Sequence, residues 1–127
     1  MTQDTPPAGF PACQTGPMLL AFSVAPSGTP ADPTRQREAA DASVHDAVAA
    51  AVKIVRESGL PNQTDSMFTT VEGEWDEVFA VVKRATEEVA KYGSRVSLVI
   101  KADIRPGFSG ELTAKVERLE NAIGGDS

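Results

Sequence analysis

Apolar positions along the chain follow the two-residue period of strands in some stretches and the 3.6-residue period of helices in others. The first such stretch, Met18 to Ala25, is apolar at both alternating sets of positions, with Leu20, Phe22 and Val24 forming one set. A strand with two apolar faces is covered on both sides. The pattern therefore predicts a central strand that is packed on each face and that Pro26 ends.

Two stretches show the i, i+3, i+4, i+7 spacing of amphipathic helices. The first runs from Val44 to Val55 and is followed by the helix breaker Gly59. The second opens at Glu74 with acidic residues in its first turn, as the helix dipole favours, and Gly93 closes it. The apolar stripe of this second helix comprises Trp75, Val78, Phe79, Val82 and Val89. Because it belongs to the stripe, the Trp75 ring is predicted to lie in the core rather than to form an exposed stacking surface.

The start of the first helix has two alternatives. Asp32 can cap it with Pro33 at the first helical position, or Ser43 and Asp46 can form a capping-box-like pair farther along. In either case the breakers that follow Pro26 predict a loop.

Between the two helices, residues 60–72 hold two short β-rich segments, around Asn62–Thr64 and Met67–Glu72. Asp65 and Ser66, which join them, are good turn formers. The pattern predicts a β-hairpin that leads into the second helix.

The last part of the chain predicts a long strand and a third helix. Arg95 to Arg105 alternates between apolar and mostly polar positions, which is typical of a strand. After a Pro-Gly break at 106–107, Leu112, Val116, Leu119 and Ile123 mark a short amphipathic helix.

The predicted order is strand, helix, strand, strand, helix, strand, with one added helix. Two right-handed β-α-β units that share a sheet give an α+β ferredoxin-like βαββαβ sandwich with both helices on one face. We expect this domain over residues 18–123, between a disordered tail at 1–17 and a frayed end at 124–127. Its other sheet face carries apolar residues, so association is expected through that face, through the sheet edges or under the third helix.

Composition and net charge limit the classes of partner that the chain is expected to bind. The 127 residues are 41 % hydrophobic, which suits one globular domain, and the formal net charge of −6 argues against nucleic acid or anionic membranes as partners. A neutral or cationic small molecule fits better. The N-terminus has no basic region followed by an apolar run, and no stretch approaches the ~20 apolar residues of a membrane span, so a cytoplasmic location is expected.

Reactive side chains are few. The single cysteine, Cys13, lies in a Pro/Gly-rich stretch without a basic neighbour, and the single histidine, His45, lies off the apolar stripe of its helix. One cysteine and one histidine cannot make a disulfide framework or a Cys/His metal pair. We therefore expect no metal site and no enzymatic activity.

Four blocks of this chain resemble the thiamine-binding protein family. They are Ser-Val-Ala-Pro-Ser-Gly-Thr (23–29), Ser-Val-His-Asp-Ala-Val through Arg-Glu-Ser-Gly (43–59), Thr-Thr-Val-Glu-Gly-Glu-Trp-Asp-Glu (69–77) and Arg-Val-Ser-Leu-Val-Ile-Lys-Ala-Asp-Ile-Arg (95–105). The resemblance implies a small cytosolic ferredoxin-like protein that associates as a dimer or tetramer. It also implies that the bound ligand is thiamine or its hydroxymethylpyrimidine part, with no further cofactor.

Two features depart from the family pattern. The loop after Pro26 is about ten residues longer than the usual short connection, which would reshape the rim of a pocket. The hairpin turn reads Asp65-Ser66 where members often carry Gly-Pro, a change that affects turn geometry more than chemistry.

An aminopyrimidine ring needs an acceptor for its amine, donors or hydroxyls for its ring nitrogens and a flat apolar surface. Thr69, Thr70 and Glu72 offer such groups at one strand end, and three more side chains can converge from neighbouring strands. The candidate ligand contacts are Ser23, Thr69, Thr70, Glu72, Ser97 and Asp103.

Structural roles for these residues stay open at this point. The two threonines are good strand formers, and Glu72 can cap the helix that follows it. Asp103 can pair with Lys101 or Arg105.

The favoured interpretation is a binding module for thiamine or a pyrimidine precursor, serving vitamin salvage or delivery. The alternatives are a small ferredoxin-like enzyme of the cofactor-free monooxygenase or isomerase type, in which His45 and a carboxylate act as acid and base, and a regulatory oligomerisation domain.

Overall fold

The computed structural model describes residues 16–30, 40–107 and 109–124. Its elements follow the predicted order. They are β1 (Met18–Ser27), α1 (Ala40–Glu57), β2 (Asn62–Thr64), β3 (Thr69–Gly73), α2 (Trp75–Val89), the short 3₁₀ helix η3 (Ala90–Tyr92), β4 (Arg95–Asp103) and α3 (Glu111–Gly124). Most of the predicted tail, Cys13, residues 31–39 of the long loop and the last three residues lie outside the described parts.

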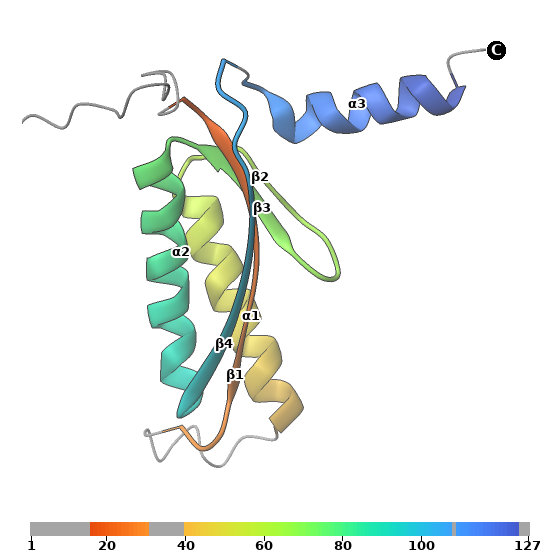
Figure 1. Cartoon of the computed structure of the whole chain (residues 1–127). Helices are drawn as coiled ribbons and strands as arrows, with labels where there is room; N and C mark the ends of the chain where they lie inside the picture. Colours follow the sequence, from red (N-terminus) through yellow and green to blue (C-terminus); the bar gives the residue numbers. More distant parts are fainter. Residues whose placement is uncertain (1–15, 31–39, 108, 125–127) are drawn as a thin grey trace, which may run out of the picture.

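The strands form one antiparallel sheet in the order β2-β3-β1-β4, and α1 and α2 pack side by side on one of its faces (Figure 1). This is the ferredoxin-like α+β arrangement, so the predicted fold class and the added third helix are confirmed. Helix α1 begins at Ala40, between the two predicted starts.

The core lies between the sheet and the two helices. Residues paired directly across antiparallel strands share a face. On β1 the set Met18, Leu20, Phe22 and Val24 is buried against the helices, as its alternation predicts. The largest fully buried side chains in this layer are Leu20, Val55, Val71, Val78 and Val89.

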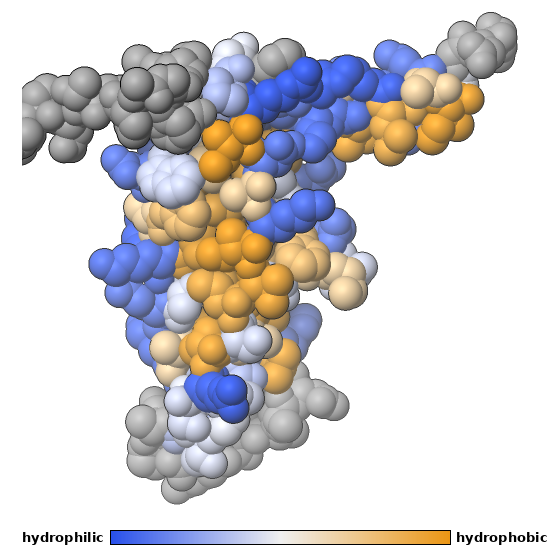
Figure 2. All heavy atoms as spheres, in the orientation of Figure 1, coloured by the Kyte–Doolittle hydropathy of each residue, from blue (hydrophilic) through white to orange (hydrophobic). Residues whose placement is uncertain are grey.

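The opposite sheet face has no helix of the described chain packed along it. Helix α3 extends away from the sheet and leaves Val116, Leu119 and Ile123 51 %, 58 % and 74 % exposed (Figure 1). On edge strand β4, Val99 pairs with Ser23 and lies on this open face, 51 % exposed. Leu98 and Ile100 pair with Val24 and Phe22 and are exposed at the edge on the helix-facing side, and Figure 2 shows an apolar band along the sheet at this position. The predicted exposed apolar face is therefore present.

Strand β1 does not end at Pro26 as predicted. Its ladder with β4 continues to the pair Ser27↔Arg95, whereas its ladder with β3 stops at Phe22↔Thr69. Proline lacks an N–H, and a strand accepts it where that N–H would meet no neighbouring strand. Pro26 lies in the half of β1 that pairs with β4 alone among the described strands, so the strand continues through it.

The prediction of a buried Trp75 is wrong. Trp75 is the first residue of α2 and is 49 % exposed; its ring lies 4.9 Å from the Phe79 ring, centroid to centroid, at 40°. Trp75 lies at the very start of the helix, and its ring packs on that of Phe79 instead of entering the core.

Gly93, which follows η3, allows the backbone to cross β1 closely. A Cβ atom at this position would lie 2.5 Å from the Ser27 carbonyl oxygen and 3.0 Å from its nitrogen. Backbone atoms cannot move aside cheaply, so we expect Gly93→Ala to lower the free energy of unfolding by about 1–3 kcal/mol in urea titrations. Gly124→Ala is the control, because no atom lies within 4 Å of its added Cβ. Equal urea midpoints for the two variants would contradict the close approach.

Candidate functional site

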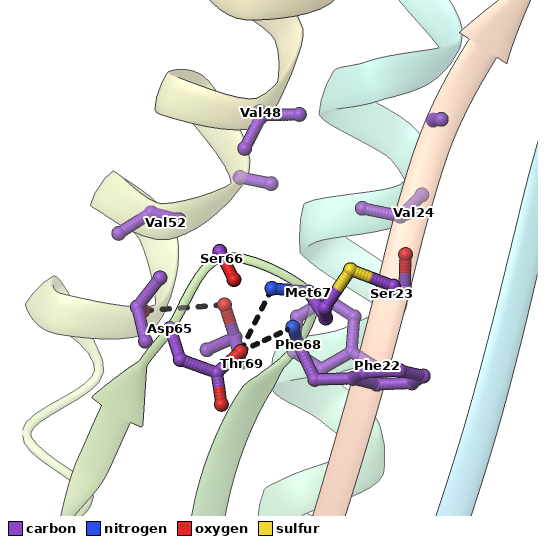
Figure 3. Close-up of a pocket in the computed structure, with 13 residues that line it drawn as sticks. Phe22, Ser23, Val24, Val48, Val52, Asp65, Ser66, Met67, Phe68 and Thr69 are labelled. Carbon is purple, nitrogen blue, oxygen red and sulfur yellow. Dashed lines mark hydrogen bonds between the residues drawn. The ribbon is translucent and has the colours of Figure 1, made fainter.

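A cavity of about 180 Å³ lies between β1, the β2–β3 hairpin and α1 (Figure 3). It forms where β3 ends its ladder with β1 at Thr69, so that the hairpin turn and the second half of β1 face each other across a gap. The lining residues are Phe22, Ser23, Val24, Ala25, Val48, Ala51, Val52, Thr64, Asp65, Ser66, Met67, Phe68 and Thr69.

The hairpin turn is held rigidly by Asp65. One of its carboxylate oxygens accepts hydrogen bonds from the backbone N–H groups of Met67 (2.8 Å) and Phe68 (2.9 Å), and its own N–H donates to the Phe68 carbonyl (2.9 Å). The Phe68 N–H, and then the Met67 N–H, hold the pKa of Asp65 below its ordinary value, so the carboxylate is ionised at neutral pH. The Asp-Ser turn thus fixes one wall of the cavity.

The remaining walls are mostly apolar. Val48, Ala51 and Val52 come from α1, and Phe22 and Val24 come from β1. Thr69 is buried, and its hydroxyl lies 3.2 Å from that of Thr64 across the hairpin. The cavity therefore combines flat apolar surface with a few hydroxyls, a composition that suits a small ring.

Two of the six predicted ligand contacts, Ser23 and Thr69, line this cavity. By register Thr69 faces the helices, whereas the other five side chains lie on the open sheet face. Glu72 and Asp103 flank Leu19, and Ser97 pairs with Ala25, six residues farther along β1. At about 3.4 Å per residue this is ~20 Å, so the six side chains do not meet at one point of a single chain.

Glu72 has a structural partner that the sequence did not indicate. The residue is 6 % exposed, and its carboxylate accepts hydrogen bonds from the first two N–H groups of α3, those of Glu111 (3.1 Å) and Leu112 (3.2 Å). Glu72 therefore caps α3 and not α2. The cap of α2 is Glu74, in a capping box with Glu77.

The main partner of Asp103 is Lys115 of α3, and not Lys101 or Arg105 as the sequence suggested. The hydrogen bond from Lys115 holds the pKa of Asp103 below its ordinary value. Similarly, Arg118 donates to both carboxylate oxygens of Glu111 and lowers the pKa of that carboxyl. The Asp103–Lys115 ion pair and the Glu72 cap therefore fasten the base of α3 to β4 and β3, whereas the Glu111–Arg118 pair lies within α3.

Sequence reasoning assigned none of the other lining residues to a ligand site, among them Val48, Val52, Met67 and Phe68. Val48 and Val52 belong to an apolar stripe that reads as core, yet Val48 is 41 % exposed. His45 is exposed on α1 and does not line the cavity. Among the described residues no group of three or more His, Cys, Asp or Glu side chains is placed to hold a metal, and no helix is both long and apolar enough to cross a bilayer.

Residues 20–120 match the family model described as thiamine-binding protein. The UPF0045 protein Mb1933 of Mycobacterium bovis is 48 % identical over 107 residues, which cover 84 % of this chain and 94 % of that protein. A solved domain of unknown function (DUF77) from Bacillus cereus is 28 % identical with a TM-score of 0.61, covering 80 % of this chain and 90 % of its own.

A solved Thermotoga maritima protein, described provisionally as acting in thiamine biosynthesis or salvage, superposes with a TM-score of 0.62 over 80 % of this chain and 98 % of its own. At 20 % identity this likeness supports the fold alone.

The Glu72 cap predicts a specific effect on α3. Replacing Glu72 with Ala removes two charge-assisted hydrogen bonds, each worth about 1.5–3 kcal/mol, so the Glu111 and Leu112 amides should exchange with solvent at least ~10-fold faster in NMR experiments. Glu74→Ala is the matched control, because it removes the cap of α2 and should leave these two amides unchanged. Unchanged exchange in Glu72→Ala would show that α3 is fastened by other contacts.

Proposed function

This chain belongs to the thiamine-binding protein family, and from that premise we propose that it binds thiamine or its hydroxymethylpyrimidine part in the cavity between β1, the hairpin and α1. The observation that carries the proposal is a cavity of ring size, with apolar walls and hydroxyls, in a chain whose family match spans the whole cavity.

The size of the cavity favours the pyrimidine part of the ligand. Pockets for drug-sized molecules span about 300–1,000 Å³, and this one has about 180 Å³. A single substituted ring is therefore the better match, and the thiazolium of thiamine would lie toward the rim. The ionised Asp65 carboxylate at the hairpin turn, and the net charge of −6, favour a cationic thiazolium there.

We propose binding without chemical conversion, for salvage or delivery of the vitamin in the cytoplasm. The polar side chains of the cavity already serve the hairpin: Asp65 holds the turn, and Thr69 pairs with Thr64. Such engaged groups suit a rigid pocket better than proton transfer, which needs a group free to gain or lose a proton.

We further propose that the chain associates with copies of itself through the open sheet face and α3. A face that leaves Val99 of edge strand β4 half exposed is favourable to bury, and the exposed stripe of α3 projects beyond it. Ligand contact by Thr70, Ser97 and Asp103, which lie on this face, remains a prediction that depends on the assembly.

Filling the cavity should weaken ligand binding. Val48→Trp places an indole in a cavity of ring size, so we expect at least ~10-fold weaker binding of hydroxymethylpyrimidine in isothermal titration. Val44→Trp is the matched control, one turn earlier on α1, equally exposed and outside the cavity.

Two outcomes of this titration would contradict the proposal. No heat with thiamine, hydroxymethylpyrimidine or thiamine diphosphate up to millimolar ligand would reject the function. Normal binding by Val48→Trp together with loss of binding in Thr70→Val would keep the function but move the site to the open sheet face.

Association is tested by sedimentation equilibrium. We expect a mass that is a multiple of the 13.4 kDa chain, and a shift toward the single-chain mass in Val99→Asp, because a buried unpaired carboxylate is strongly unfavourable. Val44→Asp, on the helical side, should not change the mass. A single-chain mass for the unmodified protein would reject the proposed assembly.

A further inference from the structure

The second half of β1 has a free edge that faces the cavity. From Ser23 to Ser27 the strand is paired with β4 on one side, and no strand of the described chain pairs with it on the other side. Backbone N–H and C=O groups along such an edge retain the capacity to bind a partner.

The lining of the cavity shows that it adjoins this edge. Four consecutive residues, 22–25, contact it. Successive side chains of a strand point to opposite faces, so four in a row can border one cavity only along the side of the strand, where the backbone is accessible. Figure 3 shows Met67 of the hairpin reaching toward Ser23 across this gap.

Pro26 indicates which residue presents its backbone to the cavity. In an antiparallel strand the N–H and C=O of one residue point to the same side, and those of the next residue point to the other. The ladder with β4 continues through Ser27, so the position that lacks an N–H must face away from β4. Val24, two residues earlier, faces the same way as Pro26 and therefore directs its N–H and C=O toward the cavity.

The side chains around the cavity have less hydrogen-bonding capacity left for a ligand than this backbone edge has. Asp65 is bound to two N–H groups of its own turn, and the Thr69 hydroxyl is paired with Thr64. A buried N–H and C=O without partners are unfavourable, so the Val24 backbone favours a ligand that carries an acceptor beside a donor. An aminopyrimidine carries this pair as a ring nitrogen next to an exocyclic amine.

We propose that the Val24 backbone binds the aminopyrimidine edge of the ligand through two hydrogen bonds. The ring nitrogen accepts one from the Val24 N–H, and the amine donates the other to the Val24 C=O. The ligand thereby takes the place that a residue of β3 would occupy if the ladder continued. This inference deepens the proposed function and rests on it for the ligand class.

The first experiment compares hydroxymethylpyrimidine with its oxo analogue, in which a ring N–H and a carbonyl replace the ring nitrogen and the amine. The analogue has nearly the same shape and reverses the donor and acceptor, so we expect at least ~100-fold weaker binding in isothermal titration. If neither compound binds, the proposed function fails. If both compounds bind equally, the ligand class stands, but the proposed hydrogen bonds to the Val24 backbone are overturned.

The second experiment observes the Val24 amide directly in the ¹⁵N-labelled full chain. We expect fast hydrogen exchange without ligand and at least ~10-fold slower exchange with saturating hydroxymethylpyrimidine. The Leu20 amide, within the ladder to β3, is the internal control and should stay protected in both states. A Val24 amide that is already protected without ligand, or that ligand does not protect, would overturn the proposal.

A pair of variants separates backbone from side chain. Val24→Pro removes the N–H while sparing the ladder to β4, as Pro26 does naturally, whereas Val24→Ala keeps the N–H and shortens the side chain. We expect at least ~10-fold weaker binding in Val24→Pro than in Val24→Ala. Equal affinities in two folded variants would contradict the proposal; should Val24→Pro fail to fold, the exchange experiment decides.

Discussion

Within the described parts of the chain, the central strand β1 has two neighbouring strands along its first half and one along its second, and the features of the site depend on this difference. Where both neighbours are present, β1 and the helices form the core around Leu20 and Val71. Where β3 has ended, backbone hydrogen-bonding capacity is left beside an apolar cavity. Pro26, which would disrupt a strand paired on both sides, is accommodated by the same difference.

The hairpin turn forms one side of the gap beside β1. Asp65 accepts hydrogen bonds from the backbone of Met67 and Phe68 and so stabilises the turn next to the point where the ladder with β1 ends. The apolar residues of α1 then form the base of the cavity. Local turn chemistry and the packing of α1 thus act together on one small volume.

A separate set of polar contacts controls α3. The buried Glu72 carboxylate and the Asp103–Lys115 ion pair fix the base of the helix, and its apolar stripe remains exposed. These polar contacts orient α3, because its apolar stripe does not pack against the described part of its own domain. The exposed stripe and the open sheet face then lie near one another, which is favourable to a partner that can cover both.

Hydrophobic periodicity by itself determined the order of elements, the ferredoxin-like class and the core set on β1, because burial against two helices imposes a period that is visible without coordinates. The hairpin turn at Asp65 was equally readable from residue type. Only the tertiary structure decided where β3 stops pairing, which side of Pro26 is unpaired, and that Glu72 caps a helix 39 residues away instead of the one beside it. Those facts depend on contacts between distant segments, which leave no local pattern in the chain. The candidate site changed for the same reason: residue chemistry pointed to six polar side chains, and the register separated them and placed a strand edge and the valines of α1 at the cavity.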